Sequence, residues 1–430
     1  MNAAAATSPV DAQLPVWRDP AFRARNVDIV AVLIAFSLPW STSLVGIFCL
    51  IWLWAVAATL DFRPFLQSLQ RPVSALPIAL FVLALAGTLW SEASWGARLY
   101  ALGPVSKLLV LPFLLYHFER STRGMWVFVA FLVSCALLMA LSWIVAFQPQ
   151  LALKPDAEFG VPVKNYIDQS QEFALCGVVL AYPVIGLLRV KRWLAASLLA
   201  AIALSFILNM VFVTISRTAM VTFPVTLLVF ALLHLKWRSV FAGLCLVIIL
   251  AGTAWIASTQ LQQRTSTFLR DYQLYKERNL PTSIGLRLEF WKKSLVFFGE
   301  APVIGHGTGS IRGLFDRAAV NRAGVEAATI GNPHNQTLNV AIQWGIVGVA
   351  LLYAMWLCHL LIFRGEGLVA WIGLIVVAQN ISTSLFNSHL FDFNEGWMYV
   401  LGVGVAGGMG LGSPARSAIG TGTLSQSSPK

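Results

Sequence analysis

The sequence is poor in charge, since only 11% of its 430 residues are Asp, Glu, Lys or Arg. A soluble domain carries about a quarter. Hydrophobic residues make up 57% of the chain, and this imbalance excludes a soluble globular protein. Apolar runs of about 20 residues recur, whereas the ten-residue alternation of a membrane β-barrel does not. We therefore expect an all-α integral membrane protein, because helices satisfy their own backbone hydrogen bonds in lipid.

The short motifs of several enzyme classes are also missing. The chain contains no DxD, HExxH, Walker or GxSxG element, and its acidic residues outside the apolar runs are scattered. Because metal-dependent sugar transfer usually needs clustered carboxylates, we expect neither a metal nor another cofactor. The five cysteines lack CxxC spacing and lie in apolar runs, which indicates buried side chains rather than disulfides or metal ligands. They are Cys49, Cys135, Cys176, Cys245 and Cys358.

The net charge of +11 would suggest nucleic acid as a partner of a soluble protein. Here the basic residues gather in alternate short loops, as the positive-inside rule predicts for cytoplasmic loops, so we do not expect nucleic acid. This bias predicts cytoplasmic N- and C-termini. The long polar interval at 258–336 then lies outside the membrane, in the periplasm if the chain resides in a bacterial inner membrane.

The apolar runs predict about twelve membrane spans, the first two forming a hairpin about Pro39-Trp40-Ser41. Residues 1–27 are read as a cytoplasmic tail, 28–257 as spans one to nine, 258–336 as a periplasmic loop, 337–411 as spans ten to twelve, and 412–430 as a disordered cytoplasmic tail. The expected spans are 28–41, 43–60, 74–90, 99–117, 125–147, 172–188, 193–213, 218–235, 239–257, 337–362, 367–386 and 393–411.

The interval at 258–336 is the one long polar stretch, and it is rich in Arg and Lys. A second outside loop, at about 148–171, is expected to form the other wall of a site. Clustered arginines facing outward from a membrane favour chemistry on a lipid-linked phosphate.

Arginines are the first candidate site residues. Arg217 lies in a tight outer junction, where it either snorkels to water or marks a substrate site. Arg287 lies on an expected surface helix capped by Ser283, one turn before Trp291, and either belongs to the wet face or clamps a lipid headgroup. Arg264 and Arg270 are further candidates. The apolar stripe of that helix comprises Leu286, Phe290, Trp291, Leu295 and Phe298.

His334 is the candidate catalytic group. Asn332 fits an N-cap and Pro333 the first helical position, so His334 and Asn335 are expected in the first turn of a membrane helix. The positive end of the helix dipole would attract anions and keep the imidazole neutral, able to accept a proton. The alternative is a histidine merely tolerated at the interface.

The stretch Gly305-His306-Gly307-Thr308-Gly309 looks like a phosphate-cradling loop. No strand–helix unit surrounds it, so it is not a dinucleotide fingerprint, and a set of backbone turns that require glycine is the favoured explanation. Gly305, Gly307 and Gly309 therefore rank as supporting candidates, together with Asn335 and Trp291.

These features together resemble the O-antigen ligases, which are related to O-antigen polymerases and to some protein O-oligosaccharyltransferases. The resemblance rests on the expected spans, the late periplasmic loop, Ser216-Arg217-Thr218, Arg287 with Trp291, the glycine motif above, and His334-Asn335-x-x-Leu338 followed by Gly345 and Gly348.

The resemblance implies a fold similar to the metal-independent members of the GT-C membrane glycosyltransferases. It implies transfer of a glycan from undecaprenyl diphosphate to the lipid A–core oligosaccharide, which completes lipopolysaccharide. By position, Arg217 and Arg287 match diphosphate-binding arginines and His334 matches an essential histidine. One inverting displacement is expected, because no carboxylate pair for a covalent intermediate is visible.

Two other functions stay open. A polymerase or protein O-glycosyltransferase would use the same donor with another acceptor. A transporter or flippase of lipid-linked sugars would need charged or broken helices near the bilayer midplane, where Lys107 is the main charge. No internal repeat suggests two related halves.

Overall fold

The computed structural model describes residues 19–155, 158–214, scattered positions between 224 and 256, and 259–412. Throughout these residues the regular structure is helical, which confirms the all-α prediction. Among the described residues, five helices are long and apolar enough to cross a membrane, or six when the bent pair Thr42–Ala57 and Phe62–Leu69 counts as one span. The protein is therefore a helical membrane protein. The expected spans at 218–235 and 239–257 lie outside the fully described residues.

The other expected spans each coincide with helical structure. The elements are α1 (Pro20–Ser37), α2 (Thr42–Ala57), α3 (Phe62–Leu69), α4 (Pro72–Ala86), α5 (Trp95–Ser106), η2 (Lys107–Leu109), α6 (Val110–Phe118), α7 (Gly124–Phe147), η3 (Pro149–Leu151), α8 (Tyr166–Arg189), α9 (Trp193–Phe212), α12 (Thr259–Arg278), α13 (Ser283–Glu300), α14 (Ile311–Ala319), η4 (Gly324–Ala327), α15 (Gln336–Ile362), α16 (Leu368–Thr383) and α17 (Phe393–Leu411).

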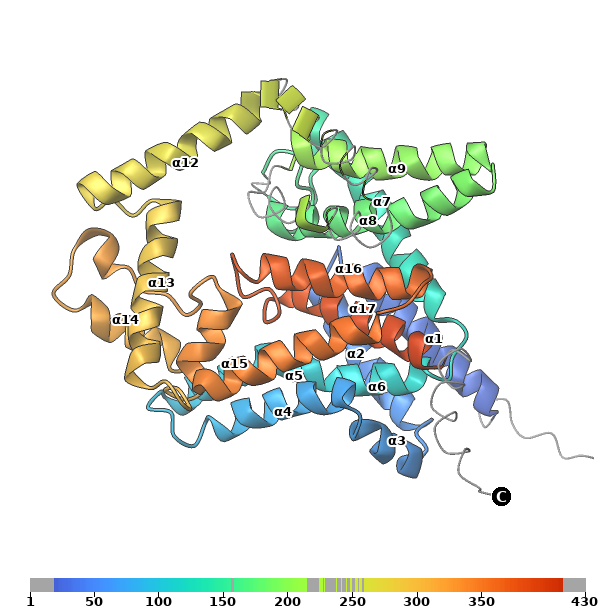
Figure 1. Cartoon of the computed structure of the whole chain (residues 1–430), viewed down its shortest axis with the longest axis horizontal. Helices are drawn as coiled ribbons and strands as arrows, with labels where there is room; N and C mark the ends of the chain where they lie inside the picture. Colours follow the sequence, from blue (N-terminus) through green and yellow to red (C-terminus); the bar gives the residue numbers. More distant parts are fainter. Residues whose placement is uncertain are drawn as a thin grey trace, which may run out of the picture.

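The centre of the bundle is formed by α15, α16 and α17, with α4 to α6 on one side and α7 to α9 on the other (Figure 1). Helix α17 packs on α6 and α16 through a run of small residues. A Cβ added at Gly404 would meet Leu114 Cβ at 2.5 Å, and one at Gly408 would meet Leu115 O at 2.8 Å. Glycine is needed here because it lets the two helix backbones approach closely.

The segment between α12 and α15 gathers at one end of the bundle, opposite the ends of α1 and α17 at Pro20 and Leu411 (Figure 1). Helix α13 begins after Thr282, whose side chain accepts a hydrogen bond from Gly285 N, so the expected cap at Ser283 is wrong by one residue. Phe290 and Phe297 pack with α14 and α15. The buried face of α13 therefore rests on protein, whereas Leu295 of the expected apolar stripe is exposed.

Helix α15 is broken at Gly345, which has φ 60° and ψ −156°. The amide of Ile346 donates to Pro302 O at 2.8 Å and that of Val347 to Val303 O at 3.3 Å. The loop after α13 thus fills the break, and this contact fixes the α13–α14 segment against the bundle.

Candidate functional site

His334 lies just before α15, half-buried, with its backbone in the left-handed region at φ 54°. Its amide donates to Asn332 Oδ1 at 3.0 Å, and its ring Nδ1 lies 2.8 Å from Asn387 Oδ1. The ring also lies beside Phe290 of α13, with a centroid separation of 6.4 Å. A neighbouring residue therefore holds the backbone of His334, and elements distant in sequence hold its ring.

The expected helix start is wrong. Asn335, not Asn332, is the N-cap of α15, because its Oδ1 accepts from Leu338 N at 3.0 Å. His334 therefore precedes the helix instead of lying in its first turn. Asn332 instead ties two loops, since its Oδ1 also accepts from Ser388 Oγ at 2.7 Å.

Arg287 of α13 lies close enough to His334 and His389 to affect the ionisation of both. Burial lowers the pKa of His334 below its ordinary value; the Asn387 hydrogen bond acts against this, and the Arg287 charge adds to it. The imidazole is thus neutral at pH 7 and can accept a proton. Burial is the main cause of this shift.

Trp291 follows Arg287 by one turn on α13 and is half-buried. Its indole Nε1 is buried without a hydrogen-bond partner among the described residues.

Asn335 joins two segments, because its Nδ2 donates to Leu385 O at 3.1 Å in addition to the capping bond. The structure thus places Asn335 in the join between the His334 segment and the loop that precedes α17.

Sequence reasoning missed an acidic cluster beside this site. His389, Asp392 and Glu395 offer ligand-type atoms within 4.8 Å of one another, and Asp168 of α8 interacts electrostatically with His389 and Glu395. The acids that look scattered in the sequence are therefore brought together by α8 and α17. One signal was available: Asp168 and Glu395 each lie in the first turn of a helix whose start faces the predicted periplasmic side.

Burial lowers the pKa of His389 to about 4 and raises that of Asp392 to about 7. His389 Nε2 is 3.9 Å from Asp392 Oδ2 and from Glu395 Oε1. Because the imidazole is neutral at pH 7 and these distances are long for hydrogen bonds, the three groups do not form an ion pair in the ordinary sense.

Two lysines supply positive charge to the cluster. Lys107 Nζ donates to Phe391 O at 3.0 Å and to Asp392 O at 2.5 Å, close to the two carboxylates. Lys164, from the loop before α8, donates to Asn394 Oδ1 at 2.7 Å. The carboxylates thus have resident ammonium groups as counter-charges, and we interpret the cluster as an internal network that holds the loop before α17. The 148–171 loop contributes to this network through Lys164.

The glycine loop does not present its amides to a ligand. The N–H groups of His306, Gly307, Thr308 and Gly309 donate to Ile342 O, Gln343 O, Gly87 O and Gln343 Oε1, at 2.8 to 3.0 Å. Gly305, Gly307 and Gly309 have φ values of +67°, +85° and +82°, which favour glycine. This geometry matches the interpretation as backbone turns packed against α15 and the α4–α5 connection.

Two of the predicted arginines cannot be placed beside His334. Arg217 lies outside the described residues. Arg264 lies within α12, but the structure does not describe its side chain. Arg270, further along α12, is exposed. Of the arginine candidates, Arg287 is the one that the described structure brings to His334.

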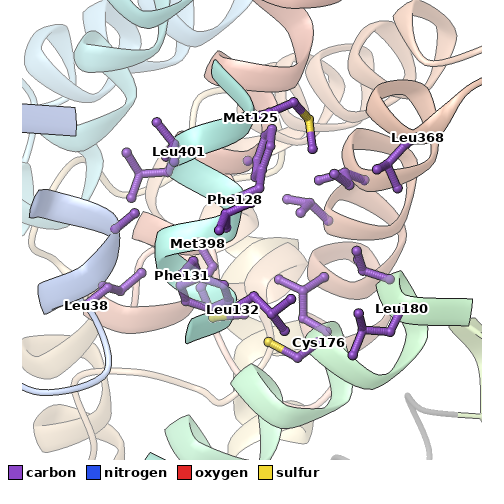
Figure 2. Close-up of a pocket in the computed structure, with 18 of the residues that line it drawn as sticks. Leu38, Met125, Phe128, Phe131, Leu132, Cys176, Leu180, Leu368, Met398 and Leu401 are labelled. Atoms are coloured by element: carbon purple, nitrogen blue, oxygen red, sulfur yellow. The ribbon is translucent and has the colours of Figure 1, made fainter. Parts of the chain in front are cut away.

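An apolar cavity of about 230 Å³ lies deeper in the bundle. Figure 2 shows side chains from α1, α7, α8, α16 and α17 pointing into it, among them Leu132, Cys176 and Met398. Cys176 follows Glu172, and Met398 follows Glu395, by about one helical turn. The cavity therefore begins where the polar ends of α8 and α17 give way to apolar side chains.

The fold and this geometry define a class of protein: a helical membrane protein whose polar site is built by the loops at one end of its bundle. The sequence profile of the family described as O-antigen ligase matches residues 202–353, about a third of the chain. This match supports the resemblance to the O-antigen ligases that the motifs indicated, over that segment of the chain. The matched range contains Arg217, Arg264, Arg287 and His334. No curated protein matches the chain.

Proposed function

We propose that this protein transfers a glycan from undecaprenyl diphosphate to lipid A–core oligosaccharide on the periplasmic face of a bacterial inner membrane. The observation that carries the proposal is that half-buried His334 and Arg287 lie within electrostatic reach of each other at the end of the bundle, within the family-matched segment. A neutral imidazole beside a guanidinium suits a reaction in which a hydroxyl loses its proton while a diphosphate departs.

The proposed step is one displacement at the anomeric carbon. The acceptor oxygen forms its bond to that carbon while the carbon–phosphate oxygen bond breaks, and the electron pair leaves with the diphosphate. His334 takes the hydroxyl proton. Arg287, with Arg217 and Arg264 as further diphosphate ligands, stabilises the growing negative charge, so its effect is greatest in the transition state.

The acidic cluster changes the argument for inversion. The structure brings Asp392 and Glu395 together, so the lack of a carboxylate pair can no longer be used to exclude a covalent intermediate. Burial nevertheless favours the protonated form of Asp392 in the folded protein, and a protonated carboxyl is a poor nucleophile. We therefore keep the single inverting step as the proposal. A product linkage with the donor's own anomeric configuration, measured by NMR, would contradict it.

The apolar cavity is our candidate for part of the polyprenyl chain. Its lining is carbon and sulfur from six helices, α9 included, and it begins one turn below the polar ends of α8 and α17 (Figure 2). A lipid with a charged headgroup and a long hydrocarbon tail matches this succession of polar and apolar surroundings.

We also propose the finer architecture: twelve spans in a GT-C-like arrangement, with both termini cytoplasmic. The described chain begins at α1 and ends at α17 on the side away from α13 and α14, which supports this topology (Figure 1). Labelling of single introduced cysteines by a membrane-impermeant reagent tests it. Reaction of an N-terminal cysteine from the periplasm would contradict it.

The decisive experiment joins a purified lipid-diphosphate glycan to lipid A–core in the presence of a chelator. We expect ligation by the native protein and at least a hundred-fold loss in His334→Ala, as is typical when a general base is removed. Arg312→Ala is the matched control, because Arg312 is exposed and forms an ion pair with Asp316, at 3.0 Å, in the same extramembrane segment. Full activity of His334→Ala would show that the base lies elsewhere.

The same assay separates the main alternative. The family match is compatible with O-antigen polymerases, which use the same donor. A polymerase would lengthen the glycan and leave lipid A–core unmodified, and a protein O-glycosyltransferase would need a protein acceptor. The buried charges around Lys107 would suit a transporter, but their hydrogen bonds hold a loop rather than line a path. A transporter would move lipid across vesicles without forming a covalent product.

A further inference from the structure

Two loops, far apart in sequence, are joined by hydrogen bonds at the site. The amide of Gln336 donates to Ser384 O at 2.9 Å, and the amide of Leu390 donates to Gln336 Oε1 at 3.1 Å. Asn335 Nδ2 donates to Leu385 O at 3.1 Å. The loop at 384–392 is therefore held in register with the segment that carries His334.

Asn387 is the residue of this loop that reaches the imidazole, with 2.8 Å between its Oδ1 and His334 Nδ1. The neighbouring Ser388 donates to Asn332 Oδ1, which in turn accepts from His334 N. Asn387 thus contacts the ring directly, whereas the next residue, Ser388, reaches the backbone of His334 only through Asn332. This double contact fixes the direction in which the ring points.

A carbonyl oxygen can only accept a hydrogen bond, and a neutral imidazole has one N–H and one lone pair. We propose that Asn387 is a positioning residue: its Oδ1 keeps the proton of His334 on Nδ1 and presents the Nε2 lone pair to the acceptor hydroxyl. This inference rests on the proposed role of His334 as the base. In the step above, Nε2 then takes the hydroxyl proton and later releases it to water.

An amide suits this position better than a carboxylate would. A carboxylate would stabilise the imidazolium, whereas the neutral amide orients the ring with a smaller effect on its charge. The other charged or titratable groups that act on this ring are Arg287 of α13 and His389 of the same loop as Asn387. Asn387 therefore fixes the tautomer while its surroundings keep the ring neutral.

The test compares Asn387→Ala and Asn387→Asp in the ligation assay across pH 5.5 to 9. In Asn387→Ala we expect kcat to fall about ten- to a hundred-fold with KM within about two-fold, because substrate contacts remain but the tautomer is no longer fixed. Asn387→Asp retains the acceptor oxygen, so it should recover most of the rate. Its negative charge should also move the acidic limb of the pH–rate profile to higher pH.

Leu385→Ala is the matched control, because the Leu385 side chain is exposed on the same loop. A second readout does not need activity: ¹⁵N chemical shifts of histidine-labelled protein report the tautomer. The chain has six histidines, and the His334 signals are assigned by their loss in His334→Gln. We expect an Nδ1–H tautomer in the native protein and a mixture in Asn387→Ala.

Three results would overturn the inference. They are a native Nε2–H tautomer, an unchanged rate in Asn387→Ala, and an Asn387→Asp variant as slow as Asn387→Ala with an unshifted pH profile. The last result would mean that Asn387 donates through Nδ2 or only holds the loop. Failure of the proposed function gives a different pattern, with the expected tautomer present but no loss of activity in His334→Ala.

Discussion

Gly305→Ala tests whether the glycine loop is a structural element or a phosphate cradle. A Cβ at this position would lie 2.5 Å from the backbone nitrogen of Trp344 and equally close to the backbone of Gln343. Main-chain atoms within a packed helix cannot move aside as a flexible side chain does. The residue also has φ +67°, a conformation that costs an L-residue about 1–2 kcal/mol.

Adding about 1–3 kcal/mol for overpacking to this strain gives an expected destabilisation of about 2–5 kcal/mol. The assay is thermal unfolding in one detergent at a fixed scan rate, since membrane proteins often unfold irreversibly. Gly313→Ala in α14 is the matched control, because no heavy atom lies within 4 Å of its added Cβ. The control should be neutral or more stable by about 0.5–1 kcal/mol.

The refuting result is specific. If Gly305→Ala has the same unfolding temperature as the native protein but ligates poorly with a raised KM for the donor, then the loop contacts substrate. The interpretation of its amides as purely structural would then be wrong. A lower unfolding temperature together with a normal KM in the remaining folded protein would agree with the packing argument.

Three further predictions follow from the site. Arg287→Lys should lower kcat/KM at least ten-fold, because lysine lacks the planar guanidinium that binds two phosphate oxygens at once. Lys292→Ala, at an exposed residue of the same helix, should leave kcat/KM unchanged. Native activity in Arg287→Lys would exclude bidentate binding. Burial raises the folded-state pKa of Asp392 to about 7, so the contribution of this residue to native stability falls as pH rises from about 4 to 7. Asp392→Asn should remove this loss and raise the free energy of unfolding by about 1–2 kcal/mol at pH 8, a value reduced for solvent screening because the Asp392 side chain is 31% exposed. A difference in unfolding temperature that does not change with pH would refute this. Leu132→Trp, which fills the apolar cavity, should raise KM for an undecaprenyl donor more than for a ten-carbon analogue, and equal changes would remove the cavity from the lipid path.

The membrane helices were predictable because their signal is local. A run of apolar residues between polar loops gives a helix whatever it packs against, so expected spans such as 125–147 and 193–213 match α7 and α9 closely. Fine boundaries depend on which polar side chain finds a free amide. Asn332 and Asn335 are equally good caps in the sequence, and the chain uses Asn335 because Asn332 is engaged with His334 and Ser388.

The candidate site was predictable only in part, because only some of its residues are marked by a local sequence signal. Arg287 and His334 were chosen by residue type and by their place in an outward polar segment, and the fold brings them together. Asn387 and His389 carry no such local signal. Their roles arise from the packing of α17 and its preceding loop on α8 and α15, which a pattern read along one chain does not encode.

The buried network around Lys107 shows how a charge is kept inside an apolar bundle. Each buried ion is expensive in a medium of low dielectric unless it is paired and hydrogen bonded. Lys107 and Lys164 both reach the residues at the start of α17, one through backbone carbonyls and the other through Asn394. These contacts hold the loop that carries Asn387, and Asn387 in turn holds His334. Because Lys107 holds this loop in place, we expect Lys107→Met to lower the rate in the ligation assay, while the pH dependence of the remaining activity, which His334 would set, stays unchanged.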